Sequence, residues 1–203
     1  DALQGLRRFE AAVESYDRAN ALEAGVPEIY NNRGVALQAL GKFEDAIASY
    51  DQAVYLNASY AQAWSNRGNA LRSLGRYDEA LPNYDRAIAL EPTYADAHAN
   101  RAGAFDEMER PAEAIAGYET AVTLTPAFVD AKRRLLALYM QGTDDTARIA
   151  RLADDLAEHA GRQAAAELRG RKTLPDFRIQ HDLEQADYLM KNGHAFAGLS
   201  AAR

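Results

Sequence analysis

A 34-residue repeat runs through most of this chain and constrains its fold more than any other feature. The segment Ala61–Tyr94 is one complete copy, and the same residue types return at steps of 34 on both sides of it. Four positions are identical in four copies: Ala12, Ala46, Ala80 and Ala114; Tyr16, Tyr50, Tyr84 and Tyr118; Ala19, Ala53, Ala87 and Ala121; Leu22, Leu56, Leu90 and Leu124. Chance does not produce such agreement, so the copies must fold alike and stack on one another.

The residue types indicate a stack of helix pairs. Small alanines let the two helices of a pair approach closely, and tyrosine fills the wider gap to the next pair. Positions typical of a tetratricopeptide repeat (TPR), a helix–turn–helix unit, are filled in one copy by Trp64, Gly68, Leu71, Ala80, Tyr84, Ala87 and Pro92. Over residues 1 to about 141 the chain therefore resembles the TPR family. This resemblance implies an all-α, right-handed superhelical solenoid followed by a non-repeat helical C-terminal extension.

The register of the repeat divides the chain into predicted units. These are a partial TPR that keeps its second helix (1–26), three full TPRs (27–60, 61–94 and 95–128), a terminal helix pair that caps the stack (129–160), and a basic linker with a C-terminal helix and tail (161–203). We expect the capping helix to end near Ala160 and a short helix to cover Gln163–Arg169. The last helix is predicted at Asp182–Asn192, docked on the capping helix or, alternatively, in a TPR groove.

Glycine and proline mark the predicted turns. Gly41 and Gly75 stand between the two helices of their units, where a residue at positive φ ends the first helix. The third unit has Glu109 at this position, followed by Pro111 in the first turn of the next helix. Pro82 lies inside a predicted helix, which it should kink at a cost of about 3 kcal/mol.

Asparagine recurs at the sixth position of each full unit, which in stacked TPRs faces a concave groove. Asn32, Asn66 and Asn100 occupy it. An amide carries two donors and an acceptor, so it can pair with a peptide backbone without selecting side chains. The pattern resembles the asparagine ladder in the TPR groove of O-linked N-acetylglucosamine transferases. Asparagine is also common at this position in TPRs as a local capping residue, and both interpretations remain open.

Arginine follows each of these asparagines, at a position where the TPR family usually has leucine. Arg33, Arg67 and Arg101 share the 34-residue period with a row of carboxylates: Asp17, Asp51, Asp85 and Glu119. We expect an arginine–carboxylate ladder with a structural role.

Part of the sequence resembles the two-carboxylate clamp of co-chaperone TPR domains, which grip a terminal carboxylate. Asn69, Asn100 and Arg134 match that pattern, whereas Ser65 and Asp130 stand where the clamp has lysines. The charge along the groove changes from acidic (Asp96, Asp106 and Glu107) to basic (Lys132, Arg133 and Arg134). The predicted groove residues are Asn32, Asn66, Asn69, Asn100, Arg133 and Arg134.

Composition excludes several classes of function. The net charge of −7 disfavours binding to nucleic acid or to a membrane surface, and the absence of cysteine excludes thiolate chemistry. The four histidines show no metal-binding spacing, and no phosphate-binding glycine loop occurs, so we expect no cofactor, no metal and no catalysis. A cytoplasmic, bacterial protein is expected.

The predicted function is a non-catalytic scaffold that binds a protein or peptide in its concave groove. An alternative is the substrate-recruiting part of a larger enzyme, such as a glycosyltransferase, oxygenase or sulfotransferase, because the Asn-Arg-Gly units resemble TPR arrays of bacterial multidomain enzymes. The partial first repeat leaves apolar surface around Phe9 and Tyr16, so self-association through this edge is also predicted.

Overall fold

The computed structural model describes residues 2–23, 25–142 and 146–170, and all regular secondary structure in these ranges is α-helical. The helices are α1 (Ala2–Leu22), α2 (Pro27–Ala39), α3 (Phe43–Leu56), α4 (Ala61–Ser73), α5 (Tyr77–Leu90), α6 (Ala95–Glu107), α7 (Pro111–Leu124), α8 (Val129–Gly142) and α9 (Thr146–Gly170). Contacts group the chain into two compact units, residues 1–124 and residues 125–203. The predicted helix at Asp182–Asn192 and its docking site lie outside the described residues.

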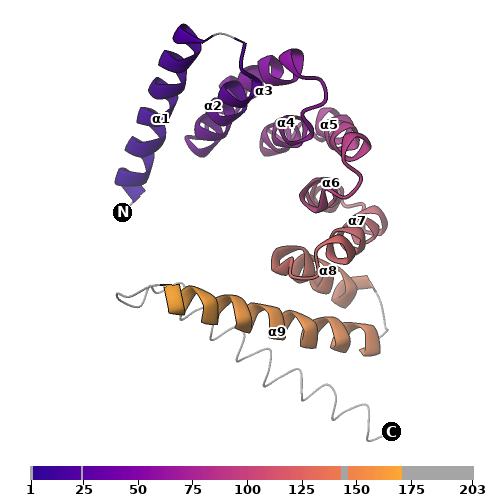
Figure 1. The fold of residues 1–203 in the computed structure, drawn as a ribbon. Coiled ribbons are helices and arrows are strands. Elements are labelled where there is room, and N and C mark those ends of the chain that lie inside the picture. Colours follow the sequence, from indigo (N-terminus) through magenta and orange to yellow (C-terminus); the bar gives the residue numbers. More distant parts are fainter. Residues whose placement is uncertain (1, 24, 143–145, 171–203) are drawn as a thin grey trace, which may run out of the picture. The chain divides into compact units, whose positions relative to one another are not determined.

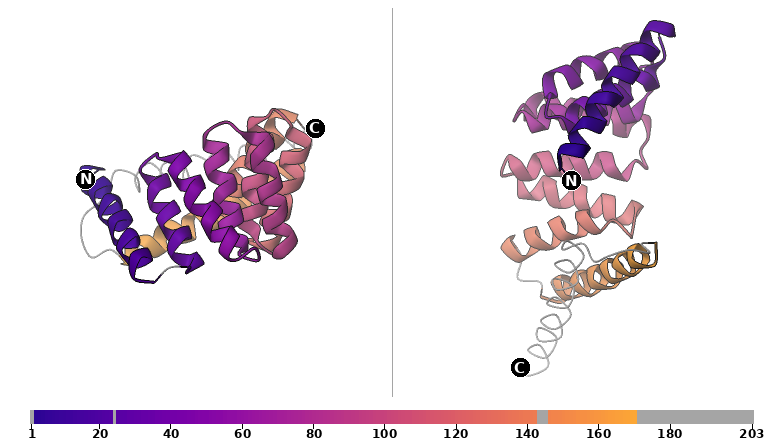
Figure 2. Two further views of the ribbon diagram at one scale, coloured as in Figure 1. Left: turned by 90° about the horizontal axis from the view of Figure 1, so that it is seen from above. Right: turned by 90° about the vertical axis from the view of Figure 1, so that its left-hand side faces the viewer.

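The first unit is a stack of helix pairs. The pairs α2–α3, α4–α5 and α6–α7 pack internally, each pair packs on the next, and α1 packs on α2. Within this unit α2, α4 and α6 line the inner side of the arc, while α3, α5 and α7 form the outer side (Figure 1). The views in Figure 2 show these helices lying side by side. The predicted all-α solenoid of TPR-like pairs is therefore confirmed.

The repeated alanines and tyrosines form the core of this stack. Tyr50 and Tyr84 are completely buried, as are Ala46 and Ala80, which precede them by four residues. Each of these tyrosine rings lies against a glycine of its own repeat, because a Cβ added to Gly34 would approach Tyr50 to 2.5 Å and one on Gly68 would approach Tyr84 to 2.7 Å. Glycine is therefore needed at these two positions so that the ring can fill the interface.

The turn between the helices of a pair has the same form in all three full repeats. Gly41 and Gly75 have φ of +72°, and Glu109 takes the equivalent left-handed conformation at +56°. In the second repeat, the backbone N–H of Arg76 then donates to the carbonyl of Leu71 at 3.0 Å, and equivalent bonds close the other two turns. The positive-φ turn predicted at the two glycines is confirmed, and Pro111 begins α7 as expected.

Helices α1 and α5 both run on through a position that was expected to interrupt or bend a helix. Helix α1 has 21 residues and continues through Arg7, which stands where Gly41 makes the turn in the next repeat. Helix α5 contains the exposed Pro82 yet runs unbroken over 14 residues. The proline cannot donate to the carbonyl of Asp78, so the helix loses one backbone hydrogen bond at its outer surface.

The second unit consists, among the described residues, of α8 packed on α9. Its apolar core joins Val129, Leu136 and Leu156 with Ile149 and Leu152. The predicted break near Ala160 is wrong, because α9 continues through Gly161 to Gly170. A glycine inside a helix costs about 1 kcal/mol relative to alanine, and the alanine-rich sequence that follows offsets this cost. No helix in the described parts of the chain is long and apolar enough to cross a bilayer.

Candidate functional site

The inner side of the first unit is formed by one face from each of three helices, and most of its side chains are polar. We call these residues the inner face; four positions at helical spacing contribute from each helix: Glu28, Asn32, Val35 and Ala39 in α2; Gln62, Asn66, Asn69 and Ser73 in α4; Asp96, Asn100, Gly103 and Glu107 in α6. Helix α4 contacts both α2 and α6 directly. The repeat thus places equivalent side chains of successive units next to one another.

Two of the asparagines at the sixth position of the repeat, Asn66 and Asn100, make contacts that join neighbouring repeats. The Asn66 amide donates to Oδ1 of Asn31 at 2.9 Å, and Asn31 is only 1% exposed. Asn31 in turn donates to Oδ1 of Asn32 at 3.3 Å, and Asn32 is exposed. Asn66 itself is half-buried, so its amide has both a structural contact and an accessible side.

The same arrangement recurs between α4 and α6 with different residues. The Asn100 amide lies 3.5 Å from the hydroxyl oxygen of Ser65, which also hydrogen-bonds with Tyr94. Asn69 accepts a hydrogen bond from the hydroxyl of the buried Tyr84 at 2.8 Å. Asn69 and Asn100 are both half-buried. The inner face is therefore held in place by hydrogen bonds within and between repeats.

Arg72 was not among the residues predicted for this face, although its side chain extends from α4 to residues of α6. Its Nη1 donates to the carbonyl oxygen of Asn100 at 3.1 Å, and its Nε lies 3.6 Å from Glu107. A Cβ on Gly103 would come within 2.7 Å of Nη1, so the guanidinium would have to shift if this residue carried a side chain. The sequence did contain a signal, since Gly103 stands where the preceding repeats have Val35 and Asn69.

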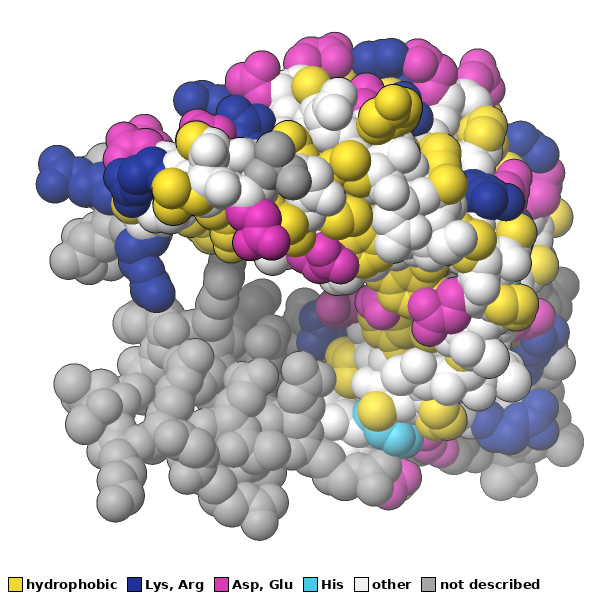
Figure 3. All heavy atoms as spheres, turned by 45° about the horizontal axis from the view of Figure 1, so that its top comes forward, with side chains coloured by type: hydrophobic (Ala, Val, Ile, Leu, Met, Phe, Trp, Pro, Cys, Tyr) yellow, Lys and Arg dark blue, Asp and Glu magenta, His cyan; other side chains and the backbone are white. Residues whose placement is uncertain are grey.

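The predicted arginine–carboxylate ladder is confirmed at three steps. Arg33 pairs with Asp17 at 2.7 Å, Arg67 with Asp51 at 2.6 Å and Arg101 with Asp85 at 2.7 Å. Each bond joins the first helix of one repeat to the second helix of the preceding repeat. On the surface of the first unit, acidic and basic side chains frequently lie next to each other (Figure 3).

The basic residues predicted for the groove belong to the second unit. Arg133 and Arg134 are exposed on α8, and Arg133 lies 3.8 Å from Asp130. Lys132 is different: it is fully buried, forms an ion pair with Asp155 of α9 and lies 3.2 Å from Nδ1 of His159. The expectation that Lys132 adds to an exposed basic groove is therefore wrong, because the helix that covers it also supplies its counter-charge.

Histidine serves as a structural residue in the third repeat. His98 is 8% exposed and its Nε2 donates to the carbonyl of Pro92 at 3.0 Å. Trp64 makes the equivalent bond in the preceding repeat, to the carbonyl of Ala58 at 3.0 Å. In both repeats the side chain ties the start of the helix to the loop before it. Within the described ranges, no group of three or more histidines and carboxylates could hold a metal ion.

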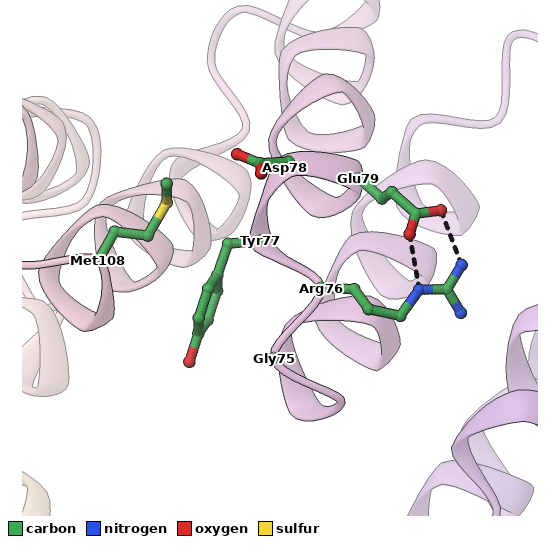
Figure 4. Close-up of a pocket in the computed structure, with 6 residues that line it drawn as sticks. All are labelled: Gly75, Arg76, Tyr77, Asp78, Glu79 and Met108. Atoms are coloured by element: carbon green, nitrogen blue, oxygen red, sulfur yellow. Dashed lines mark hydrogen bonds and ion pairs between the residues drawn. The ribbon is translucent and has the colours of Figure 1, made fainter.

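A shallow depression of about 190 Å³ lies at the turn of the second repeat, separate from the predicted groove residues (Figure 4). It is lined by Gly75, Arg76, Tyr77, Asp78, Glu79 and Met108. A bidentate ion pair between Arg76 and Glu79, with both hydrogen bonds at 2.7 Å, closes one side of the depression. These bonds lower the pKa of the Glu79 carboxyl group. The depression therefore resembles a gap between surface side chains more than a binding cavity.

These helix pairs, glycine turns and buried alanine–tyrosine layers define a helical repeat solenoid. Residues 27–60 and 61–94 each match the tetratricopeptide repeat family, and the chain is a TPR protein. Its structure is similar to a crystal structure of MamA, with a TM-score of 0.68 and 25% identity over 81% of this chain and 96% of that chain.

Two further solved structures share the fold at lower sequence identity. The first TPR domain of Spaghetti (RPAP3), solved with an HSP90 peptide, gives a TM-score of 0.55 and 23% identity over 57% of this chain and 91% of that chain. YrrB, described as a TPR protein with an unusual peptide-binding site, gives a TM-score of 0.61 and 18% identity over 94% of this chain and 100% of that chain. Among curated proteins, none matches the sequence significantly.

Proposed function

We propose that this chain is a non-catalytic scaffold that binds a segment of another protein along the inner face of α2, α4 and α6. The observation that carries the proposal is the repetition of half-buried or exposed asparagines, Asn32, Asn66 and Asn100, at one position of three adjacent helices. Most apolar side chains of these helices are buried in the core, so the inner face is mainly polar, with Val35 as an exposed apolar residue. The peptide bound to the TPR domain of Spaghetti (RPAP3) supports a role of this kind.

The chemistry of the inner face suits the backbone of an extended peptide. Such a backbone offers donors and acceptors at regular intervals, and each asparagine amide can answer either kind. The hydrogen bonds from Asn66 to Asn31 and from Tyr84 to Asn69 hold these amides in fixed orientations before a ligand arrives. Preorganised polar groups lose less conformational entropy on binding. More of the interaction energy with the ligand then remains as favourable binding free energy.

Selection of random peptides displayed on phage against the full chain tests this proposal. Selected peptides should lose binding to Asn32→Ala and Asn66→Ala variants that remain folded by circular dichroism. The matched controls are Gln52→Ala and Arg86→Ala, which alter exposed residues of the outer helices α3 and α5. Peptides that bind the Asn variants normally and the outer-helix controls poorly would place the binding site elsewhere and reject the proposal.

The same inner face would also serve a larger enzyme by recruiting its substrate. The Asn-Arg-Gly segments beginning at Asn32 and Asn66 favour this second candidate, because they resemble TPR arrays attached to glycosyltransferases, oxygenases and sulfotransferases. Sequencing the gene beyond the codon for Arg203 distinguishes the two candidates. A catalytic domain in the same reading frame supports recruitment, and a stop codon there supports the independent scaffold.

Self-association through α1 is part of the same proposal. Phe9 is 40% exposed on this helix and Tyr16 is half-buried, whereas the equivalent Tyr50 and Tyr84 are completely buried. An uncovered apolar surface of this kind favours association. Light scattering should show oligomers at high protein concentration that a Phe9→Glu substitution dissociates, and a strict monomer would contradict this part of the proposal.

A further inference from the structure

The second position of each full repeat places a row of side chains at the start of the inner face. It holds Glu28, Gln62 and Asp96, all exposed. In the described residues, neither Glu28 nor Asp96 has an ion-pair partner, in contrast to the ladder carboxylates Asp17, Asp51 and Asp85. Glu28 and Asp96 thus carry exposed charges, without an ion-pair partner in the described ranges, in the first turns of α2 and α6, where the helix dipole favours a carboxylate.

Tyr60 and Tyr94 stand at the N-caps of α4 and α6, two residues before Gln62 and Asp96, at the same end of the inner face as this row. Burial and the nearby charge of Glu28 raise the pKa of Tyr60. Burial and the charge of Asp96 likewise raise the pKa of Tyr94, while a hydrogen bond with Ser65 lowers it, and Tyr60 is close enough to contribute as well. The two half-buried rings thus form one group with Glu28 and Asp96, which we call the acidic–tyrosine strip.

The rest of the inner face does not neutralise this strip. Asp106 and Glu107 add two more carboxylates at the other end of α6. Arg72 is the one cation that reaches these residues within the described part of the first unit, and it already lies 3.6 Å from Glu107. The remaining inner-face side chains are uncharged. A terminal carboxylate, the ligand of the co-chaperone clamp, would therefore meet repulsion here.

We propose that the acidic–tyrosine strip makes the inner face selective for a cationic, extended segment of a partner protein. This inference rests on the proposed function and adds the chemical class of the ligand. Each carboxylate can pair with a lysine or arginine side chain, and the neighbouring tyrosine ring can receive the same cation on its face. Backbone contacts to the asparagines would add affinity but no selectivity for charge.

The geometry also sets the spacing of the charges in the ligand. Helix α4 contacts both α2 and α6, and packed helices lie about 8–10 Å apart, so Glu28 and Asp96 are separated by roughly 20 Å. An extended chain advances about 3.3 Å per residue, so roughly six residues span this distance. The strip therefore favours two cationic residues about six positions apart.

The test uses a defined probe and the full chain. The probe is a fluorescein-labelled Gly/Ser peptide of nine residues, blocked at both ends, with lysine at its second and eighth positions; a second peptide has glutamate there. Fluorescence anisotropy should show binding of the lysine peptide alone, weakening several-fold between about 20 mM and about 200 mM salt. The Glu28→Gln/Asp96→Asn double variant should bind it about fivefold more weakly.

The matched control is Asp45→Asn/Asp78→Asn, which removes two exposed carboxylates from the first turns of α3 and α5. It should bind the lysine peptide like the unmodified chain. Equal losses in both double variants would mean that net charge alone attracts the probe, and the inference would be rejected. Normal binding by Glu28→Gln/Asp96→Asn would reject it too.

The two proposals fail in different ways. If the phage-selected peptides depend on Asn32 and Asn66 but carry no excess of lysine and arginine, the inner face is a peptide site and only its selectivity has been misassigned. If the lysine peptide responds to Glu28 and Asp96 while no selected peptide responds to the asparagines, the strip binds cations without the backbone recognition that the proposed function requires.

Discussion

Arg67 and Asp51 join two consecutive repeats through a bond of 2.6 Å between Nε and Oδ1. The same guanidinium donates from Nη1 to Oδ1 of Asn83 at 3.0 Å, so one side chain of α4 links α3 and α5. Arg33 makes the equivalent pair of bonds, to Asp17 and to the hydroxyl of Ser49. The position that the TPR family usually gives to leucine thus holds a polar connection between repeats.

The first prediction separates the two parts of this connection. Asp51→Asn should lower the free energy of unfolding by about 0.2–1 kcal/mol, because the Asp51 side chain is 47% exposed and exposed ion pairs contribute little. Arg67→Ala should cost about 2 kcal/mol, since it also leaves the buried Asn83 without this donor and removes the packed stem. Urea denaturation measures both, with the exposed Arg86→Ala as control. Equal, small effects would show that the connection contributes nothing beyond the ion pair.

In the third repeat, the glycine at the interface between the two helices of the pair stands on the second helix instead of the first. The first two repeats carry Gly34 and Gly68, whereas the third carries Ala102 at that position and Gly117 in the facing helix, where Ser49 and Asn83 stand in the others. A Cβ on Gly117 would lie 2.8 Å from the Cβ of Ala102. The Nε of Arg101 is buried there without a hydrogen-bond partner.

The second prediction is that these two positions are energetically coupled. Gly117→Ser alone should destabilise the protein by about 1–3 kcal/mol through overpacking. Adding Ala102→Gly should recover at least half of this loss, because it makes room and lets the new hydroxyl accept from Arg101, as Ser49 accepts from Arg33. A double-mutant cycle by thermal denaturation measures the coupling. Additive effects would contradict the exchange.

The third prediction concerns the left-handed turn at Glu109. This residue has φ of +56°, a conformation that costs a non-glycine residue about 1 kcal/mol, while the other two turns use glycine at +72°. Glu109→Gly should therefore stabilise the protein by up to about 1 kcal/mol, and Gly75→Ala should destabilise it by a similar amount. Urea midpoints report both changes. If Glu109→Gly lowered the stability instead, the added conformational entropy of the unfolded chain would outweigh the strain relieved at the turn.

The fourth prediction is a loss of stability in alkali. Burial raises the pKa of Tyr50 and of Tyr84 above the ordinary value near 10, with Arg72 and Glu107 making smaller, opposing contributions at Tyr84. The folded state thus holds these protons more tightly than the unfolded state. Their stabilising effect is fully present below about pH 10 and falls above it, by up to about 1.4 kcal/mol per pH unit for each tyrosine.

Urea denaturation between about pH 8 and pH 11 measures this decline. Tyr50→Phe/Tyr84→Phe should be less stable at pH 8, because Gln38 and Asn69 lose their hydroxyl partners, but its stability should decline less steeply above pH 10. An exposed tyrosine, Tyr55→Phe, serves as the control and should leave the slope unchanged. Identical slopes in all three proteins would show that other groups govern the alkaline transition.

The 34-residue register by itself determined most of the architecture of the first unit. It placed the alanine and tyrosine layers in the core, the turns at Gly41 and Gly75, and the partners of Arg33, Arg67 and Arg101. These features are periodic, so each copy supports the reading of the others. The physical basis is that stacked repeats must present equivalent faces to one another, and this makes contacts between repeats predictable from spacing alone.

Only the tertiary structure decided the contacts that differ from one repeat to the next. Whether a side chain such as Lys132 is exposed depends on which helix covers it, and α9 both covers it and supplies Asp155. The exchange between Ala102 and Gly117, and the reach of Arg72 to Asn100, likewise depend on separations of a few ångströms between backbones. Spacing in the sequence identifies which residues share a face, but close packing fixes which of them touch, because a difference of one methyl group changes the neighbour that fits.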